Sequence, residues 1–282
     1  MSLTIRPMTP HTGAEVLGVD LAKTLGAGDA DQLRKAFADR AVLIFREQRL
    51  SPPEFLKAAQ IFGDIMPQQV KRFTLNDYPL VGFVSSEDTD KPGGVRLVRG
   101  EQYHTDHSNM PVPPRATMLS AVTLPSRGGD TQFVNVHSSY DALPVETKRR
   151  IDPLRVLHVF KSSRSPRKKV ELTLEERKKV PETVQPLVLV HPENGRKALY
   201  LNTAHMERII GMGDEEAFAL INQLMAHATN PEFEYRHVWR PGDMVMWDNR
   251  SVMHQANADY DPAEKRFLHR LMLVGTPLQA AA

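Results

Sequence analysis

From about residue 80 onward, the sequence consists of short apolar runs separated by glycine, proline and asparagine turns, and this pattern restricts the fold most strongly. Each run is short and rich in β-branched or aromatic residues, which is typical of strands. The segment LVLVHPENGRKALYLN is predicted to form a hairpin with Asn194 and Gly195 at its tip. The predicted strands are LVGFV, ATMLSAVTL, TQFVNV, VLHVF, LVLV, ALYLN, EYRHVW, DMVMW and FLHRLMLVG. So many closely spaced strands favour a sandwich or barrel over a parallel α/β fold.

Helices are predicted at the flanks of this β-rich part. The clearest begins after Ser51, because Ser51 and Glu54 have capping-box spacing, Pro52 occupies the first helical position and Gly63 suits the end. Two further helices are expected over residues 29–40, capped by Asp29 or Asp31, and over residues 214–228, capped by Asp214. No repeat or linker divides the chain, so residues 1–282 are expected to form a single domain, mainly β with flanking helices.

The composition excludes several classes of function. There is no cysteine, so a metal ion would have to be held by His, Asp or Glu. A net charge of +2 and 7% aromatic residues argue against nucleic acid as a partner. The N-terminal residues carry no signal-peptide pattern, and no apolar run approaches the roughly 20 residues that cross a bilayer. We therefore expect a cytoplasmic protein with no membrane partner.

Residues 161–185 form a polar stretch with clusters of charge. Such a stretch is most often a solvated loop or an exposed helix. Long loops in compact domains also serve as lids over sites, and that interpretation stays open.

The segment EQYHTDHSNM contains a His-x-Asp pair, His104 and Asp106. With 11 His and 34 acidic residues in 282, about one His-x-acid match is expected by chance. The match at His191 lies in the predicted hairpin turn, where polar residues are normal. The match at His205 follows a strand, and His205 itself could line a pocket.

His104 and Asp106 are expected to point the same way, because alternate residues share one face of a strand. A third metal ligand would have to come from elsewhere, and the best candidate is His254 in GDMVMWDNRSVMHQAN. Two His and one carboxylate on one face of an ion leave three positions open, which is typical of non-haem Fe(II) oxygenases. The neighbouring Trp247 is expected to be core packing.

An anchor for acidic ligands is predicted in EKRFLHRLMLVG, where Arg266 and Arg270 share one strand face about 13 Å apart. Arg is suited to bidentate capture of carboxylates. The alternative is an edge strand whose arginines face solvent.

Several segments together resemble one known family: YHTDHS, LPSRGGDTQFVNV, WDNRSVMHQANADY and RFLHRLMLVG, with GAEVLGVDL and AVLIFREQRLSPPEF nearer the N-terminus. Their order and spacing are similar to those of the TauD/TfdA family of Fe(II)/2-oxoglutarate-dependent dioxygenases. The resemblance implies a double-stranded β-helix, or jelly roll, and it implies His104, Asp106 and His254 as iron ligands.

The resemblance also implies roles around the iron. Arg266 would bind the distal carboxylate of 2-oxoglutarate with help from the hydroxyl of Thr131, and Arg270 would bind an acidic group of the substrate. Positions that line the substrate pocket in relatives correspond to Gln68, Lys71, Gly100, His107 and His205.

The expected reaction is hydroxylation of a small anionic organic substrate, an aryloxyalkanoate, sulfonate or sulfate ester, with O2 and 2-oxoglutarate consumed and succinate and CO2 released. A homo-oligomer, dimer or tetramer, is expected from the resemblance. The alternatives are a hydrolase or isomerase that uses the same residues with another metal, such as Zn²⁺, and a non-catalytic small-molecule-binding barrel.

Overall fold

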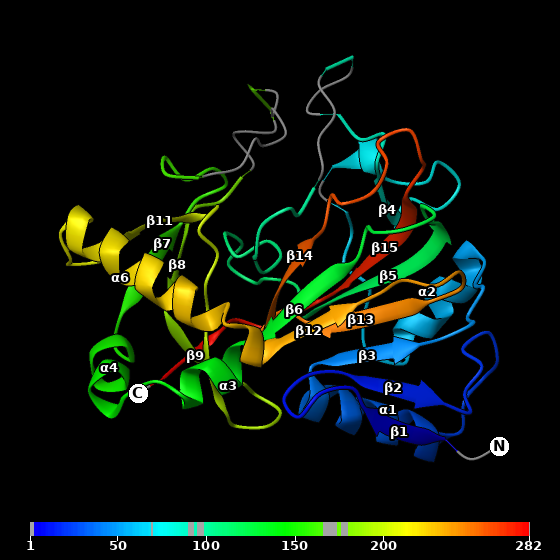
Figure 1. Cartoon of the computed structure of the whole chain (residues 1–282), viewed down its shortest axis with the longest axis horizontal. Helices are drawn as coiled ribbons and strands as arrows, with labels where there is room; N and C mark the ends of the chain where they lie inside the picture. Colours follow the sequence, from blue (N-terminus) through cyan, green and yellow to red (C-terminus); the bar gives the residue numbers. More distant parts are fainter. Residues whose placement is uncertain are drawn as a thin grey trace.

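The computed structural model describes residues 3–68, 70–89, 93–94, 99–165, 174–175 and 180–281. Its largest sheet has seven strands in the order β1-β2-β3-β13-β5-β15-β4 (Figure 1). Neighbouring strands are antiparallel except for the parallel pair β2 and β3. The strands are β1 (Thr4–Pro7), β2 (Ala14–Leu17), β3 (Val42–Phe45), β4 (Gly82–Ser85), β5 (Ala116–Thr123), β13 (Met244–Asp248) and β15 (Phe267–Leu273).

Three smaller sheets complete the β structure, in the orders β12-β6-β14, β11-β7-β8 and β10-β9-β16. Their strands are β6 (Thr131–Asn135), β7 (Arg155–His158), β8 (Thr183–Pro186), β9 (Val188–Val190), β10 (Lys197–Leu199), β11 (Met206–Ile209), β12 (Glu234–His237), β14 (Val252–Ala256) and β16 (Gln279–Ala280). The predicted hairpin is confirmed, since Val190 pairs with Lys197 across the Asn194–Gly195 turn. Gly195 has a φ of 70°, which the absence of a Cβ makes favourable.

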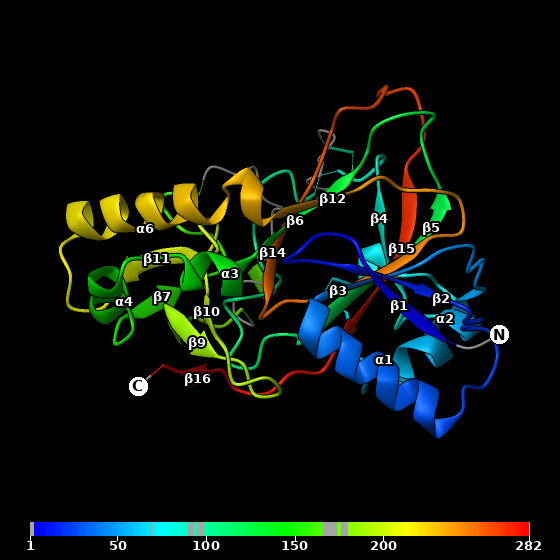
Figure 2. The ribbon, with the colours of Figure 1, turned by 60° about the horizontal axis from the view of Figure 1, so that its bottom comes forward.

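The helices cover the sheets from outside (Figure 2). Helices α1 and α2 pack on the large sheet, with contacts to β3 and β15, and α6 lies along β11. The helices are α1 (Ala27–Arg40), α2 (Pro52–Gln60), α3 (Val136–Asp141), α4 (Val145–Ile151) and α6 (Asp214–Ala228), with the 3-10 helices η1 (Lys71–Phe73) and η2 (Pro231–Phe233).

The predicted helix starts are only partly right. At α2, the Glu54 carboxylate accepts a hydrogen bond of 2.8 Å from the backbone N–H of Ser51, as the capping-box spacing predicted. The caps predicted at Asp29, Asp31 and Asp214 are wrong, because Gly26 and Gly213 are the N-caps of α1 and α6. Asp29 and Asp214 instead lie within the first turns, where a negative charge interacts favourably with the helix dipole.

Buried side chains form two layers of the core, one on each face of the large sheet. Between the large sheet and sheet β12-β6-β14, buried side chains that include Phe133, Trp247 and Leu268 pack together. The opposite face of the large sheet packs against α1 and α2. Strand β15 lies between β5 and β4, so the alternative of a solvent-facing edge strand for its arginines is wrong.

Part of the polar stretch 161–185 lies outside the described residues, namely 166–173 and 176–179, so the lid interpretation stays a prediction. The last residues of the stretch enter strand β8. Among the helices that the structure describes, none has the length and apolar character needed to cross a membrane.

Candidate metal centre

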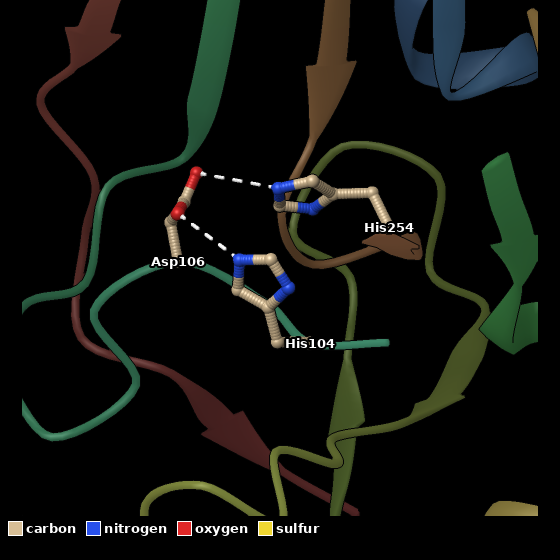
Figure 3. A group of neighbouring side chains, drawn as sticks. All are labelled: His104, Asp106 and His254. Carbon is tan, nitrogen blue, oxygen red and sulfur yellow. Dashed lines mark ion pairs between the residues drawn. The ribbon is translucent and has the colours of Figure 1, made fainter. Parts of the chain in front are cut away.

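Three side chains from distant parts of the chain converge at one point (Figure 3). Metal-binding atoms of His104, Asp106 and His254 all lie within 4.8 Å of one another. Nε2 of His104 is 3.8 Å from Oδ1 of Asp106, and Nε2 of His254 is 3.9 Å from Oδ2 (Figure 3). These separations exceed a hydrogen bond, whereas ligands about 2.1 Å from one ion lie roughly 3–4 Å apart. The three groups are therefore arranged to share a cation.

The backbone brings the two histidines together directly. His104 and His254 form an isolated antiparallel bridge, with the His104 N–H donating to the His254 carbonyl at 3.0 Å and the reverse bond at 2.9 Å. His254 belongs to β14, as its predicted extended segment requires. The strand predicted for His104 and Asp106 is wrong, however, because Asp106 already begins a turn. The bridge to His254 and the turn at Asp106, rather than alternation along a strand, direct the side chains of His104 and Asp106 to one point.

The His104 ring is held in one orientation. Its Nδ1 lies 2.8 Å from the Gln102 carbonyl, which only accepts hydrogen bonds, so Nδ1 carries the hydrogen and Nε2 keeps its lone pair. Gly100 has a φ of 86°, and a Cβ there would lie 3.2 Å from Cε1 of His104. A larger residue at position 100 would therefore press on the His104 ring.

Asp106 is held in its charged form. Burial alone would raise the pKa of Asp106, but the nearby His254, Arg270 and His104 outweigh it and the pKa is lowered overall. The donor set of two imidazole nitrogens and one carboxylate oxygen is that of 2-His-1-carboxylate iron sites. All three residues are 7–8% exposed, so an ion here would be shielded from bulk water but not enclosed.

A cavity opens beside His104, Asp106 and His254, and several of the residues predicted for the site line it. It is bounded by His104, Asp106, His254, Val84, Arg99, Gly100, Thr117, Leu119, Thr131, Trp247, Ala256, Arg266 and Arg270. The structure thus brings both predicted arginines and Thr131 to the metal-binding side chains. Trp247 is 1% exposed, as expected for core packing, and its ring centroid also lies 4.5 Å from that of His254.

Arg266 is 4% exposed and immediately precedes β15. Its Nε donates to the Gly129 carbonyl at 3.0 Å, and burial lowers its pKa. No acidic side chain pairs with Arg266 in the part of the chain that the structure describes. The hydroxyl of Thr131 accepts a hydrogen bond of 3.0 Å from Nε1 of Trp239, which holds the hydroxyl in a defined position.

Arg270 also forms no ion pair with a described side chain, although its charge contributes to the lowered pKa of Asp106. Its Nη2 makes three contacts with described side chains, 3.4 Å to Oε1 of Gln68, 3.5 Å to Nε2 of His107 and 3.4 Å to Sδ of Met272. Burial, followed by the charge of Arg270, lowers the pKa of His107 to about 4, so its ring is neutral at pH 7. Gln68 and His107 therefore gather around Arg270.

Four predicted pocket residues are not in this cavity lining: Gln68 and His107, which contact Arg270, and Lys71 and His205, which do not. Lys71 is exposed at the start of η1. Nδ1 of His205 lies 2.7 Å from the Val159 carbonyl. The sequence reasoning missed Arg99, whose Nε donates to Asp88 at 2.7 Å and whose guanidinium lies 4.2 Å from the Phe73 ring centroid. Burial lowers the pKa of Arg99 to about 10 in spite of Asp88, and no sequence pattern links these residues.

Comparison with known proteins gives matches over nearly the whole chain. Residues 4–272 match the family described as taurine catabolism dioxygenase TauD, TfdA family. The α-ketoglutarate-dependent 2,4-dichlorophenoxyacetate dioxygenase of Cupriavidus pinatubonensis is 33% identical, over 96% of this chain and 97% of its own. The (S)-phenoxypropionate/α-ketoglutarate dioxygenase of Sphingobium herbicidovorans is 32% identical, over 99% of this chain and 97% of its own. An alkylsulfatase of Acinetobacter baylyi is also 32% identical, over 97% of this chain and 85% of its own.

Solved structures agree with these sequence matches. A taurine dioxygenase from Burkholderia xenovorans superposes with a TM-score of 0.84 at 32% identity, covering 99% of this chain and 93% of its own. AAD-2, crystallised with Mn(II) and N-oxalylglycine, gives a TM-score of 0.84 at 32% identity over 100% of both chains. The expected fold, mainly β with flanking helices in a double-stranded β-helix, is confirmed.

Proposed function

This chain belongs to the TauD/TfdA family and is a 2-oxoglutarate-dependent non-haem iron dioxygenase, and we propose that it hydroxylates a small organic monoanion at Fe(II) held by His104, Asp106 and His254. Its cosubstrates are 2-oxoglutarate and O2. The proposed ligand set is supported by the convergence of the three side chains and by a donor set that suits ferrous iron.

One observation carries the proposal for the ligands: the buried guanidinium of Arg266 and the half-buried guanidinium of Arg270 line the candidate metal cavity, and neither forms an ion pair with a described carboxylate. Removing a charged group from water is unfavourable unless an opposite charge compensates it. Arg266 and Arg270 are therefore suited to anions that arrive with the ligands. Two separate arginines match two separate ligands, the cosubstrate and the substrate.

We assign the cosubstrate to Arg266. Its guanidinium would pair with the distal carboxylate of 2-oxoglutarate, and the fixed hydroxyl of Thr131 would donate to the same group. This anchoring would direct the 2-oxo acid end toward His104, Asp106 and His254, the residues that would hold the ion. When bound, the iron supplies the coupled reduction of O2, decarboxylation of 2-oxoglutarate to succinate and CO2, and hydroxylation of a C–H bond.

We assign the substrate to Arg270. Gln68 and the neutral His107 lie against its guanidinium and can supply further hydrogen bonds to a substrate anion. An anion fixed at Arg270 would hold the rest of the substrate beside the metal, which is the positioning that hydroxylation requires. Of the residues predicted for the substrate, only Arg270 lines the cavity, and Gln68 and His107 join it through their contacts with Arg270, so the substrate assignment rests on these three residues.

The named relatives support a substrate class. They include enzymes for 2,4-dichlorophenoxyacetate, (S)-phenoxypropionate and alkyl sulfates. In each of these compounds an anionic group lies close to a carbon bonded to oxygen. Hydroxylation of that carbon would give an unstable product that releases a phenol or sulfate. We propose an aryloxyalkanoate or a sulfate ester as the substrate.

The test is production of succinate from 2-oxoglutarate under air, with Fe(II) and a panel of 2,4-dichlorophenoxyacetate, 2-phenoxypropionate, an alkyl sulfate and taurine. At least one compound is expected to raise succinate well above the substrate-free rate, and omission of Fe(II) or O2 is expected to abolish the increase. A product that forms equally without O2 would instead indicate a hydrolase or isomerase. Wild-type protein that binds the compounds without turnover would indicate a binding barrel.

We also propose that residues 1–282 form one domain. Strands from both ends of the chain share the large sheet, since β13 lies beside β3 and β15 beside β4. A single cooperative unfolding transition, the same by circular dichroism and by tryptophan fluorescence, is expected.

A further inference from the structure

The two carboxylate oxygens of Asp106 have different surroundings. Oδ2 accepts a hydrogen bond of 2.6 Å from the hydroxyl of Thr117, which is completely buried. Oδ1 accepts no hydrogen bond from any residue that the structure describes. Each oxygen faces one imidazole, Oδ1 that of His104 at 3.8 Å and Oδ2 that of His254 at 3.9 Å, so the hydrogen bond from Thr117 is what distinguishes them. The carboxylate is thus held on one side and free on the other.

The direction of the Thr117 hydrogen bond follows from its neighbours. The indole N–H of Trp247 can only donate, and it lies 3.2 Å from Oδ1 of Asn249. The amide of Asn249 is therefore turned so that Nδ2 donates to the Thr117 hydroxyl oxygen at 3.0 Å. Because this hydroxyl accepts from Asn249, its own hydrogen is left for Asp106.

A second contact supports the same orientation of the amide. The backbone N–H of Asp106, also a donor, lies 3.4 Å from Oδ1 of Asn249. Nδ2 in turn lies 3.4 Å from the Pro114 carbonyl, an acceptor. Every neighbour thus agrees with a chain of donors that runs from Trp247 through Asn249 and Thr117 to Asp106.

The sheet places the members of this chain side by side. Thr117 of β5 is paired with Trp247 of β13 in the antiparallel register. Thr117 and Leu119 face the metal cavity, whereas Ala116 and Met118 face the core beneath α1 and α2. The donor chain is therefore built on two central strands, where side-chain positions are well defined.

We propose that Thr117, oriented by Asn249 and Trp247, is a positioning residue that makes Asp106 bind the metal through Oδ1 alone. A carboxylate can bind a cation through one oxygen or two. If Asp106 used both oxygens, it would take one of the three positions that a chelating 2-oxo acid and O2 require. The inference rests on the proposed metal site, and it gives a physical reason why three metal positions would stay free for 2-oxoglutarate and O2.

The test compares two ligands on Mn(II)-loaded protein, which binds the cosubstrate analogue without turnover. N-oxalylglycine takes two metal positions, whereas glutarate has the same two carboxylates but no oxo group to chelate with. Dissociation constants for both are measured by calorimetry, and that for Mn(II) by electron paramagnetic resonance of the free ion.

For Thr117→Val, which keeps the shape and removes the hydroxyl, N-oxalylglycine binding is expected to weaken about tenfold, a typical effect of losing a group that orients a ligand. Glutarate and Mn(II) binding are expected to weaken less than N-oxalylglycine binding, because neither needs the metal position that a second Asp106 oxygen would occupy. Thr117→Ser restores the hydroxyl and is expected to restore N-oxalylglycine binding. Ser120→Ala removes a buried hydroxyl from the opposite face of β5 and is expected to change none of the three.

Three outcomes would overturn the role of Thr117: unchanged N-oxalylglycine binding in Thr117→Val, equal weakening of all three ligands, or no recovery in Thr117→Ser. Equal weakening would indicate a general structural role. If Thr117→Val does not fold, as judged by circular dichroism, Thr117→Ala carries the same expectation. Wild-type protein that binds neither Mn(II) nor N-oxalylglycine would contradict the proposed function itself, which is a separate result.

Discussion

Replacement of Arg266 by Ala tests the cosubstrate anchor most directly. In the ligand-free protein, the Arg266 side chain makes one hydrogen bond, to the Gly129 carbonyl, and has no acidic partner among the described residues. Its removal therefore breaks no ion pair within the protein. The change is expected to act on ligand binding far more than on folding.

The expected magnitude follows from the burial of this group. Truncating one partner of a buried, hydrogen-bonded charge pair usually costs 2–5 kcal/mol, because the other charge stays buried without a partner. Arg266 is 4% exposed, so water would solvate the stranded carboxylate poorly. A loss of about 3 kcal/mol corresponds to roughly a 150-fold increase in the dissociation constant of 2-oxoglutarate.

The assay compares 2-oxoglutarate with 2-oxopentanoate, which has the same chain and the same 2-oxo acid group but no distal carboxylate. Both are titrated calorimetrically into Mn(II)-loaded protein. Wild-type protein is expected to prefer 2-oxoglutarate by roughly 150-fold, and Arg266→Ala is expected to lose this preference. Arg270→Ala serves as the matched control and is expected to keep it.

The reasoning would be refuted if Arg266→Ala still preferred 2-oxoglutarate as strongly as wild type. It would also be refuted if Arg270→Ala lost the preference, because the two arginines would then serve one ligand. A decrease in melting temperature with the preference intact would mean that Arg266 supports the fold alone.

Three further changes test the rest of the site. Arg270→Ala is expected to raise the KM for the acidic substrate about 100-fold while 2-oxoglutarate binding stays unchanged. If steady-state kinetics instead showed a raised KM for 2-oxoglutarate and an unchanged KM for the substrate, Arg270 would be the cosubstrate anchor and Arg266 the substrate anchor. His254→Ala is expected to leave the protein without bound iron at micromolar metal, and normal iron content by elemental analysis would remove His254 from the ligand set. Gly129→Ala places a Cβ 3.0 Å from Cδ and Nε of Arg266 at a φ of +72°, so both the melting temperature and 2-oxoglutarate affinity are expected to fall. Wild-type values for both would show that Arg266 can move aside.

The sequence predicted the elements of the fold better than it predicted their ends. Strands and helices followed from apolar periodicity, because burial of one face dictates it. The caps at Asp29 and Asp214 were wrong because each aspartate lies one or more positions inside its helix, and the glycine before the helix adopts the extended conformation of the cap without a side chain. Local composition shows that a helix start is near, but not which residue ends the extended chain.

The site was predictable to the extent that it depends on residue type. His104, Asp106 and His254 could be found as a donor set, and the two arginines could be found by alternation along one strand. The mode of assembly could not, because His104 meets His254 through a single bridge between segments about 150 positions apart in the sequence. Arg99 and Asp88 were missed for a related reason: the spacing of the two residues in the sequence matches no period or motif.

The contrast between Arg99 and the other two arginines bears on the substrate. Arg99 is paired with Asp88, so it contributes little net charge to the cavity. With a divalent ion bound, the cavity would carry three net positive charges: those of Arg266, Arg270 and the ion, less the charge of Asp106. The lowered pKa of His107 keeps that ring neutral.

The 2-oxoglutarate dianion would compensate two of these three charges. One remains, and a buried site is most favourable when its charges balance. A monoanion such as a carboxylate, sulfonate or sulfate ester meets that condition, whereas a phosphate monoester, with nearly two charges at pH 7, would leave an excess negative charge beside the carboxylate of Asp106.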